Sequence, residues 1–338
     1  MTTGPAAIER DIERIVTEGR SKGMADGDER RGQVGGQAMD RVKAINQLKR
    51  QRRAVILAHN YQPPEIQDIA DYVGDSLGLS IQAARTNAEV IVFCGVYFMA
   101  ETAKIISPGK TVLIPDREAG CPMADMITAD DLRQLKARHP GATVLCYVNT
   151  TAAVKAECDL CCTSGNAERM VRRALPADGE VIFVPDRYLA HWIGEKTGRA
   201  FIPWRGFCPT HARILPEDIA EQRARHPGAP VVAHPECRPD VTALADQVLS
   251  TEGMCTFARG ASAAEFIVGT EIGLLHRLAK ENPGKRFYPA AEHAVCPNMK
   301  RTTLEKVLRT LQELSPVVEV PEETRRRAFR SIERMLAD

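Results

Sequence analysis

The chain has 338 residues, and its 45 lysines and arginines nearly balance its 44 aspartates and glutamates. This balance excludes the basic footprint of a nucleic-acid-binding or membrane-surface protein. No apolar run is long enough to span a bilayer, and ten cysteines occur without a secretory signal. We therefore expect a cytoplasmic protein with reduced thiols that binds neither nucleic acid nor membrane.

The two ends of the chain differ from its middle. Residues 1–40 are polar and glycine-rich, which predicts a flexible N-terminal extension. We expect residues 41–53 to form the leading helix of a first module. In the last segment, 304–338, we expect two helices, at Thr303–Glu313 and Glu322–Leu336.

Between these ends, one pattern of residues occurs three times. Each copy starts with an apolar run that ends in two polar residues separated by one residue. An aspartate follows ten residues later, a hydroxyl residue comes five residues after that, and a Cys-Pro pair lies 49 or 50 residues beyond the aspartate. The aspartates are Asp71, Asp159 and Asp246. Such a repeat indicates three copies of one structural unit.

Each unit reads as an α/β module. A short apolar run predicts a buried parallel strand, and helical stretches such as Glu65–Val73 and Ala243–Val248 follow it. We expect three pseudo-symmetric, three-layer modules with parallel sheets, over residues 41–128, 129–215 and 216–303. Ligands bind at the carboxyl ends of such strands, so the modules are expected to surround a central cluster and active site.

Three cysteines carry the strongest functional signal. Cys121, Cys208 and Cys296 lie 87 and 88 residues apart, and each precedes a proline in a loop-like stretch. Thiolates at equivalent positions of three modules can converge on one metal centre. Three thiolates without a fourth protein ligand suit an iron–sulfur cluster with one open iron, while zinc remains the alternative. Either metal would act as a Lewis acid on a substrate.

The polar pairs at the ends of the three strands supply candidates for acid–base chemistry. These pairs are His59 and Tyr61, Tyr147 and Asn149, and His234 and Glu236. We predict that Tyr61, Glu236 and His234 are catalytic and that Asn149 positions the substrate by hydrogen bonding.

The repeated hydroxyl residues have two compatible interpretations. Ser76, Ser164 and Thr251 can cap helix N-termini, and a capped N-terminus with a free hydroxyl can also hold a carboxylate or phosphate. His211 lies three residues after Cys208, but we do not assign it to the site.

Several motifs closely resemble the quinolinate synthase family. The resemblance extends from about Ala54 to Lys306 and leaves the first 40 residues uncovered. Its motifs are Leu57–Ser76, Gly95–Asp125, Tyr147–Ala167, His234–Cys237, Val268–Lys280 and Ala294–Arg301. Some members carry a C-x-x-C-x-x-C run at the third cysteine, and this chain lacks it.

The resemblance implies a transferase of NAD biosynthesis that condenses iminoaspartate with dihydroxyacetone phosphate to give quinolinate, phosphate and water. It also implies one [4Fe–4S] cluster per chain on the three cysteines. A functional link to L-aspartate oxidase or aspartate dehydrogenase would follow. The implied substrate-binding residues are His59, Tyr61, Ser76, Tyr147, Asn149, Ser164, His234, Glu236, Ser250 and Thr251.

Two other functions share the three-cysteine site. A dehydratase of the aconitase-like kind would use the same open iron but not these motifs. A metal sensor would bind iron or zinc without acid–base residues, and the sequence shows no basic helix for reading DNA.

Overall fold

The computed structural model describes residues 36–176 and 178–336. A leading helix covers residues 36–51, so residues 36–40 are helical. The rest of the N-terminal extension predicted for residues 1–40 lies outside the described residues. No helix in the described part of the chain is both long and apolar enough to cross a bilayer.

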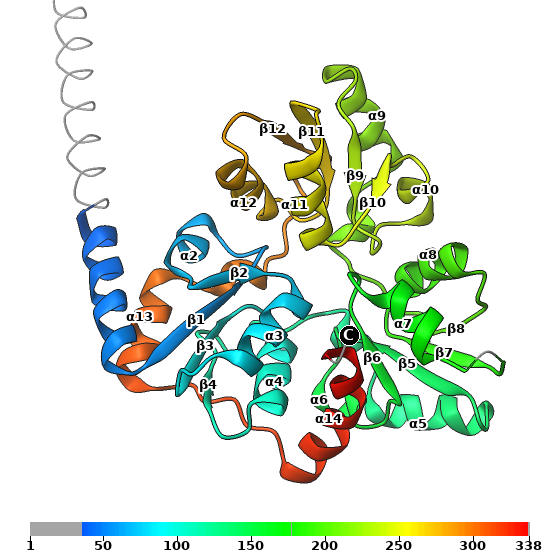
Figure 1. Cartoon of the computed structure of the whole chain (residues 1–338), viewed down its shortest axis with the longest axis horizontal. Coiled ribbons are helices and arrows are strands. Elements are labelled where there is room, and N and C mark those ends of the chain that lie inside the picture. Colours follow the sequence, from blue (N-terminus) through cyan, green and yellow to red (C-terminus); the bar gives the residue numbers. More distant parts are fainter. Residues whose placement is uncertain (1–35, 177, 337–338) are drawn as a thin grey trace, which may run out of the picture.

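Three four-stranded parallel sheets form the framework, one in each lobe of Figure 1. Their strand orders are β2-β1-β3-β4, β6-β5-β7-β8 and β10-β9-β11-β12, which is the same order in each case. The predicted α/β class with three repeated parallel-sheet modules is therefore confirmed. The residue limits of the modules stay a prediction.

The first module contains β1 (Ala54–His59), α2 (Pro64–Ile69), β2 (Tyr72–Gly74), α3 (Ser76–Arg85), β3 (Val90–Cys94), α4 (Tyr97–Ile106), β4 (Thr111–Leu113) and η1 (Ala124–Met126). The second contains α5 (Ala129–Arg138), β5 (Thr143–Tyr147), α6 (Ala152–Lys155), β6 (Leu160–Cys162), α7 (Ala167–Ala174), β7 (Val181–Val184), α8 (Arg187–Thr197), β8 (Ile202–Pro203) and η2 (His211–Arg213). The third contains α9 (Pro216–Arg225), β9 (Val231–Ala233), α10 (Pro239–Thr242), β10 (Gln247–Val248), α11 (Thr251–Gly260), β11 (Glu265–Gly269), α12 (Leu274–Glu281), β12 (Arg286–Pro289) and η3 (Met299–Arg301).

The continuous apolar strands of the first module are buried on both faces. Val55 and Leu57 of β1 join one hydrophobic cluster, and the alternating Ile56 and Ala58 join another. The second cluster includes Ile45 of the leading helix and residues of α13 (Leu304–Glu313). Because alternate strand residues face opposite sides, a sheet between two layers of helix needs apolar residues at every position.

The repeated aspartates have a structural role that the sequence repeat left open. Asp71, Asp159 and Asp246 each accept a hydrogen bond from a backbone N–H at the start of the first strand, at 2.8, 2.8 and 2.7 Å. Each aspartate stands just before the second strand of its module. It therefore ties the helix-to-strand turn to the neighbouring strand in all three modules.

The helix predicted at Glu65–Val73 is partly wrong, and the helix predicted at Ala243–Val248 is wrong throughout. α2 ends at Ile69, and α10 ends at Thr242. The chain then turns, and Tyr72–Gly74 and Gln247–Val248 pair as strands with β1 and β9. The aspartate contact to the first strand and this pairing override the local helical pattern.

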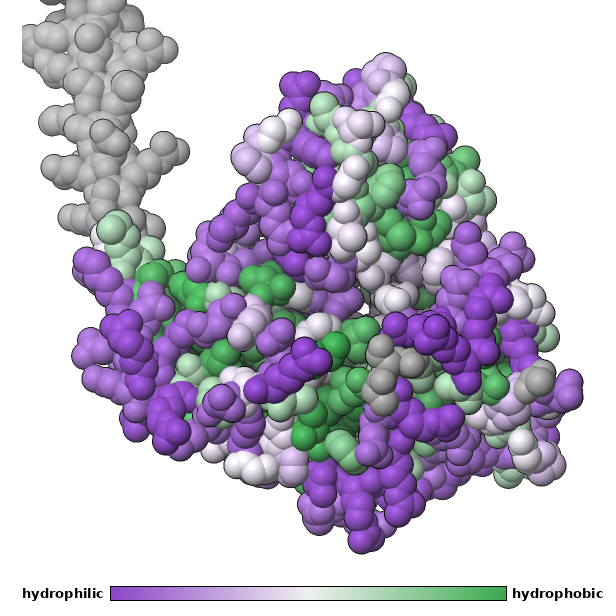
Figure 2. Space-filling model, in the orientation of Figure 1, coloured by the Kyte–Doolittle hydropathy of each residue, from purple (hydrophilic) through white to green (hydrophobic). Residues whose placement is uncertain are grey.

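The two predicted C-terminal helices are confirmed as α13 and α14 (Glu322–Leu336). α14 packs against β6, α6 and α4, and so it joins the first two modules (Figure 1). On the face in Figure 2, hydrophilic residues dominate the outer edges, and several hydrophobic side chains show toward the middle.

Candidate functional site

A cavity lies where the three modules meet, and residues of all three modules line it. Of the residues predicted from the sequence, it brings together His59, Tyr61, Ser76, Cys121, Tyr147, Asn149, Ser164, Cys208, His234, Glu236, Thr251 and Cys296. Ser250 does not line it.

The three Cys-Pro pairs adopt the same local structure. Each cysteine precedes a turn that leads into a short 3₁₀ helix, namely η1, η2 or η3. Backbone N–H groups of these turns hydrogen-bond to the sulfurs: those of Met123 and Ala124 to Cys121, of His211 to Cys208, and of Asn298 and Met299 to Cys296. Such N–H groups favour a thiolate over a thiol.

Burial acts against the charged thiolates. The pKa of Cys121 is raised to about 12, chiefly by burial and to a smaller extent by the neighbouring Cys296. Burial likewise raises the pKa of Cys208 and of Cys296, with Cys121 adding to the effect on Cys208. Buried thiolates that repel one another need a shared cation. These donors therefore fit a thiophilic metal group held between the modules.

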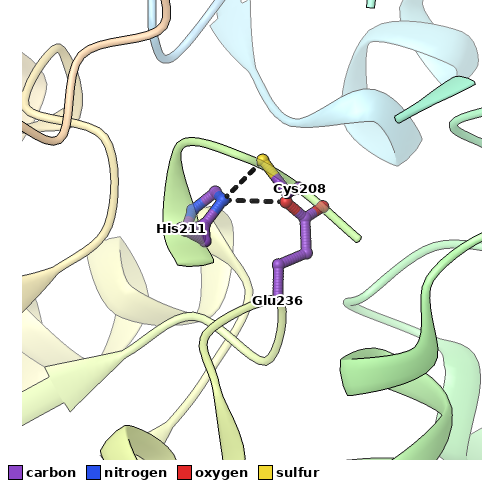
Figure 3. Close-up of side chains that lie close together, drawn as sticks. All are labelled: Cys208, His211 and Glu236. Atoms are coloured by element: carbon purple, nitrogen blue, oxygen red, sulfur yellow. Dashed lines mark hydrogen bonds and ion pairs between the residues drawn. The ribbon is translucent and has the colours of Figure 1, made fainter. Parts of the chain in front are cut away.

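Cys208 also belongs to a second set of metal-compatible donors (Figure 3). His211 Nδ1 lies 3.2 Å from Cys208 Sγ and 2.8 Å from Glu236 Oε2. The carboxylate of Glu236 is, however, already bonded to Tyr147 and Asn149. The three equivalent cysteine turns are thus the better-prepared metal site. His211 nevertheless lies in the site, contrary to the sequence-based assignment.

One chain of hydrogen bonds crosses the cavity and joins the three modules. Tyr61 Oη lies 2.6 Å from Thr270 Oγ1, which lies 2.8 Å from His211 Nε2. His211 Nδ1 is 2.8 Å from Glu236 Oε2, and Tyr147 Oη donates to Glu236 Oε1 at 2.5 Å. A carboxylate can only accept, so His211 Nδ1 carries a hydrogen. The chain links two phenols to one carboxylate.

Within this chain of hydrogen bonds, burial and neighbouring groups shift the pKa of Glu236 and the pKa values of the two tyrosines in opposite directions. Burial alone would raise the pKa of Glu236, but His211, His234 and Tyr147 hold it well below the usual value. Burial and the charge of Glu236 raise the pKa of Tyr61 and of Tyr147 well above their usual value. At neutral pH this hydrogen-bonded chain therefore holds one ionised carboxylate, Glu236, and two protonated phenols, Tyr61 and Tyr147.

The two strand-end histidines have the same hydrogen bond. His59 Nδ1 accepts from the backbone N–H of Tyr61 at 3.2 Å, and His234 Nδ1 accepts from that of Glu236 at 3.3 Å. Burial lowers the pKa of both histidines to about 3. Both rings are therefore neutral, with the hydrogen on Nε2. The repeated His-x-Tyr and His-x-Glu spacing fixes this tautomer.

None of the three repeated hydroxyl residues, Ser76, Ser164 and Thr251, is the N-cap of a helix, contrary to one interpretation of the sequence. The N-cap residues are Asp75 for α3 and Ser250 for α11, so Ser76 and Thr251 occupy the first helical position instead. The hydroxyl of Thr251 accepts from Asn60 Nδ2 at 2.8 Å. Ser250 uses its hydroxyl to accept from the N–H of Gly253, which explains its place outside the cavity.

Ser164 and Asn149 face the cavity with groups suited to a ligand. Ser164 precedes α7, whose N-cap residue is Asn166, and its Oγ lies 3.3 Å from His234 Nε2. Asn149 Nδ2 donates to Glu236 Oε1 at 3.4 Å, whereas its Oδ1 is buried with no protein partner. A buried, unpaired amide oxygen calls for a hydrogen-bond donor on a bound molecule.

Sequence reasoning missed several residues of the site. Thr270 links Tyr61 to His211, and Glu271 lines the cavity beside it. Phe98, Met99 and Met299 supply apolar walls. Neither Thr270 nor Glu271 belongs to the threefold repeat. The signals that could have found them were their place directly after an apolar run that reads as a strand and their position in the motif Val268–Lys280.

Comparison with known proteins gives a consistent result. The family model described as quinolinate synthetase A protein matches residues 43–337. A quinolinate synthase of Dehalococcoides mccartyi is 58% identical over 292 residues, which cover 86% of this chain and 96% of that protein. Quinolinate synthase 1 of Methanosarcina acetivorans is 54% identical over 301 residues, which cover 89% and 98%. The quinolinate synthase of Thermodesulfovibrio yellowstonii is 55% identical over 296 residues, which cover 87% and 97%.

Proposed function

Because this chain belongs to the quinolinate synthase family and is an enzyme that forms quinolinate, we propose that its central cavity condenses iminoaspartate with dihydroxyacetone phosphate. The products are quinolinate, phosphate and water. The enzyme acts in NAD biosynthesis on small molecules, within a family of iron–sulfur enzymes.

One observation carries the proposal: three cysteines from three modules line the same cavity as the carboxylate of Glu236 and the phenols of Tyr61 and Tyr147. We assign Cys121, Cys208 and Cys296 as the ligands of one [4Fe–4S] cluster per chain. When bound there, the cluster would supply a Lewis acid for a substrate carboxylate, carbonyl or hydroxyl, at the iron that no cysteine holds.

The chain's own residues supply the proton transfers. Carbon–carbon bond formation requires removal of a proton next to a carbonyl or imine, and the carboxylate of Glu236 is the base in reach. Loss of water requires a proton donor, and Tyr61 or Tyr147 serves because each phenol stays protonated. Thr270 and His211 connect Tyr61 to Glu236, so the proton can return to the donor.

The remaining polar groups hold the substrates. The neutral rings of His59 and His234 carry hydrogen on Nε2 and can donate to carboxylates. Ser76 and Thr251 stand at the first positions of α3 and α11, where helix N-termini favour anions. The free Oδ1 of Asn149 can accept from an imine N–H or a hydroxyl. Ser250 caps α11, and we propose that it supports substrate binding by holding the N-terminus of this helix in place.

The proposal is tested on protein purified without oxygen. We expect near-equal iron and acid-labile sulfide, and quinolinate formation from the two substrates. Replacing Cys121, Cys208 or Cys296 by serine should remove both iron and activity while the circular dichroism spectrum is retained. Zinc without sulfide would instead favour the Cys208–His211–Glu236 donor set, and retention of the cluster in all three variants would refute the assigned ligands.

We further propose that the enzyme works in the cytoplasm, apart from nucleic acid and membrane. Iminoaspartate is an unstable imine, so an enzyme that oxidises aspartate, namely L-aspartate oxidase or aspartate dehydrogenase, must supply it nearby. Quinolinate formation that requires such an enzyme and aspartate in the same reaction would support this link. Equal rates when the supplying enzyme is separated by a membrane that only small molecules cross would count against direct transfer.

A further inference from the structure

We propose that Glu271 and Lys300 are a positioning pair that holds Tyr61 of the first module against the Cys296 turn of the third. The inference rests on the proposed function, since it concerns the placement of the same phenol and the same cysteine. Neither residue belongs to the repeat, and neither takes a chemical role in the proposed reaction.

Glu271 is fully buried, and both of its oxygens are used. Oε1 accepts from the backbone N–H of Cys296 at 3.1 Å, and Oε2 accepts from that of Gly273 at 2.7 Å. Lys300 Nζ lies 2.8 Å from Oε1. The carboxylate therefore fixes the backbone of the third cysteine directly, and a single cation compensates its buried charge.

Lys300 extends this contact into the first module. Its ammonium donates to the backbone carbonyl of Tyr61 at 2.5 Å, across 239 positions of sequence. One side chain thus bonds both to the carboxylate that holds the Cys296 N–H and to the residue that presents the phenol. An ammonium has three N–H donors, so it can serve both partners at once.

Gly273 shows how closely the two segments are packed. A Cβ atom at this position would come within 2.8 Å of the backbone carbonyl carbon and oxygen of Tyr61 and of Glu271 Oε2. Gln67 Nε2 also donates to the carbonyl of Gly273 at 2.8 Å. The first and third modules therefore meet here through backbone atoms, where a small displacement moves Tyr61.

The pseudo-symmetry argues that the pair is not needed to build a module. The strand registers place Val96 in the first module and Asp186 in the second at the position of Glu271. Four residues after the cysteine, where the third module has Lys300, the first has Asp125 and the second has Ala212. The same fold thus forms twice without the ion pair, which occurs only beside Tyr61.

The test compares four variants of the holoenzyme. Lys300→Met removes the bond to Tyr61 but leaves Glu271 unpaired, whereas the double variant Lys300→Met/Glu271→Gln removes the bond and the buried charge together. Lys300→Arg is the conservative rescue. Arg301→Met is the matched control, because Arg301 pairs with Asp116 and Glu118 of the first module and does not touch Tyr61.

We expect Lys300→Met and the double variant to lower kcat by about 100-fold, the scale of a misplacement of roughly 1 Å at a reacting group. Their KM should change by less than about threefold, and Lys300→Arg should recover most of kcat. Iron content should be retained. Amide hydrogen exchange should become faster both around Tyr61 and in the Cys296 turn, whereas Arg301→Met should leave exchange around Tyr61 unchanged.

Two results would overturn the inference. Recovery of kcat in the double variant would mean that Lys300 only neutralises Glu271. An equal loss in Arg301→Met would mean that any contact between these modules has the same effect. If the wild-type protein formed no quinolinate, the proposed function would fail, while the coupled change in amide exchange would still decide whether the pair joins the two segments.

Discussion

Replacing Glu236 by glutamine separates the chemical role of this residue from its structural role. The carboxylate accepts from Tyr147 at 2.5 Å and from His211 at 2.8 Å. Glutamine keeps the shape and one acceptor oxygen. Its amide nitrogen, however, is itself a donor and would face either the hydroxyl of Tyr147 or the N–H of His211. The expected loss of folding stability is about 1–2 kcal/mol, the usual effect of one unsatisfied buried hydrogen bond.

The effect on catalysis should be much larger. A positioned base contributes about 100- to 10,000-fold in rate, which corresponds to about 3–5 kcal/mol of transition-state stabilisation. An amide cannot accept the proton that the reaction releases. We therefore expect the kcat of quinolinate formation to fall by at least about 100-fold, while KM changes little.

The assay follows quinolinate under anaerobic conditions, with iron and sulfide measured on the same sample. Glu101→Gln is a suitable control, because Glu101 is a largely buried carboxylate that accepts from the Ala152 N–H and does not line the cavity. Glu236→Gln with an intact cluster and a rate within about threefold of the wild type would remove Glu236 from the base role.

Three further expectations follow from the site. Thr270→Val should lower kcat by at least about tenfold, because it removes the shorter hydrogen-bonded path between Tyr61 and His211 and leaves only their direct contact at 3.3 Å, and Thr270→Ser should restore it; equal rates in both variants would refute a relay through Thr270. Ser250→Ala should lower the free energy of unfolding by about 1 kcal/mol through loss of the α11 cap and leave KM unchanged; a large rise in KM would instead make Ser250 a direct substrate contact. His234 has a pKa of about 3 in the fold and 6.5 in the unfolded chain, so it contributes stability above pH 6.5 that is lost as pH falls toward 3. The urea midpoint should therefore drop on acidification by more in the wild type than in His234→Gln, and an equal drop would contradict a neutral buried ring.

Much of the site could be predicted from the sequence because the chain repeats itself. The three modules share one strand order, so residues that recur at the same position of the sequence repeat occupy equivalent places in the three modules. Cys121, Cys208 and Cys296 therefore line one cavity. The same logic places His59 and His234 at strand ends. Local hydrogen bonding, such as the His-x-Glu contact, needs only neighbours in sequence, and a pattern of residues determines it.

The packing of the modules against one another decided the rest. Thr270 meets Tyr61 across 209 positions, and Lys300 reaches it across 239 positions. Such contacts depend on the angles at which three separate sheets meet, which no periodicity within one sheet encodes. The cap of α11 departs from the sequence-based prediction for a local reason. Ser250 has the extended backbone of an N-cap residue, so Thr251 is the first residue of the helix and lines the cavity.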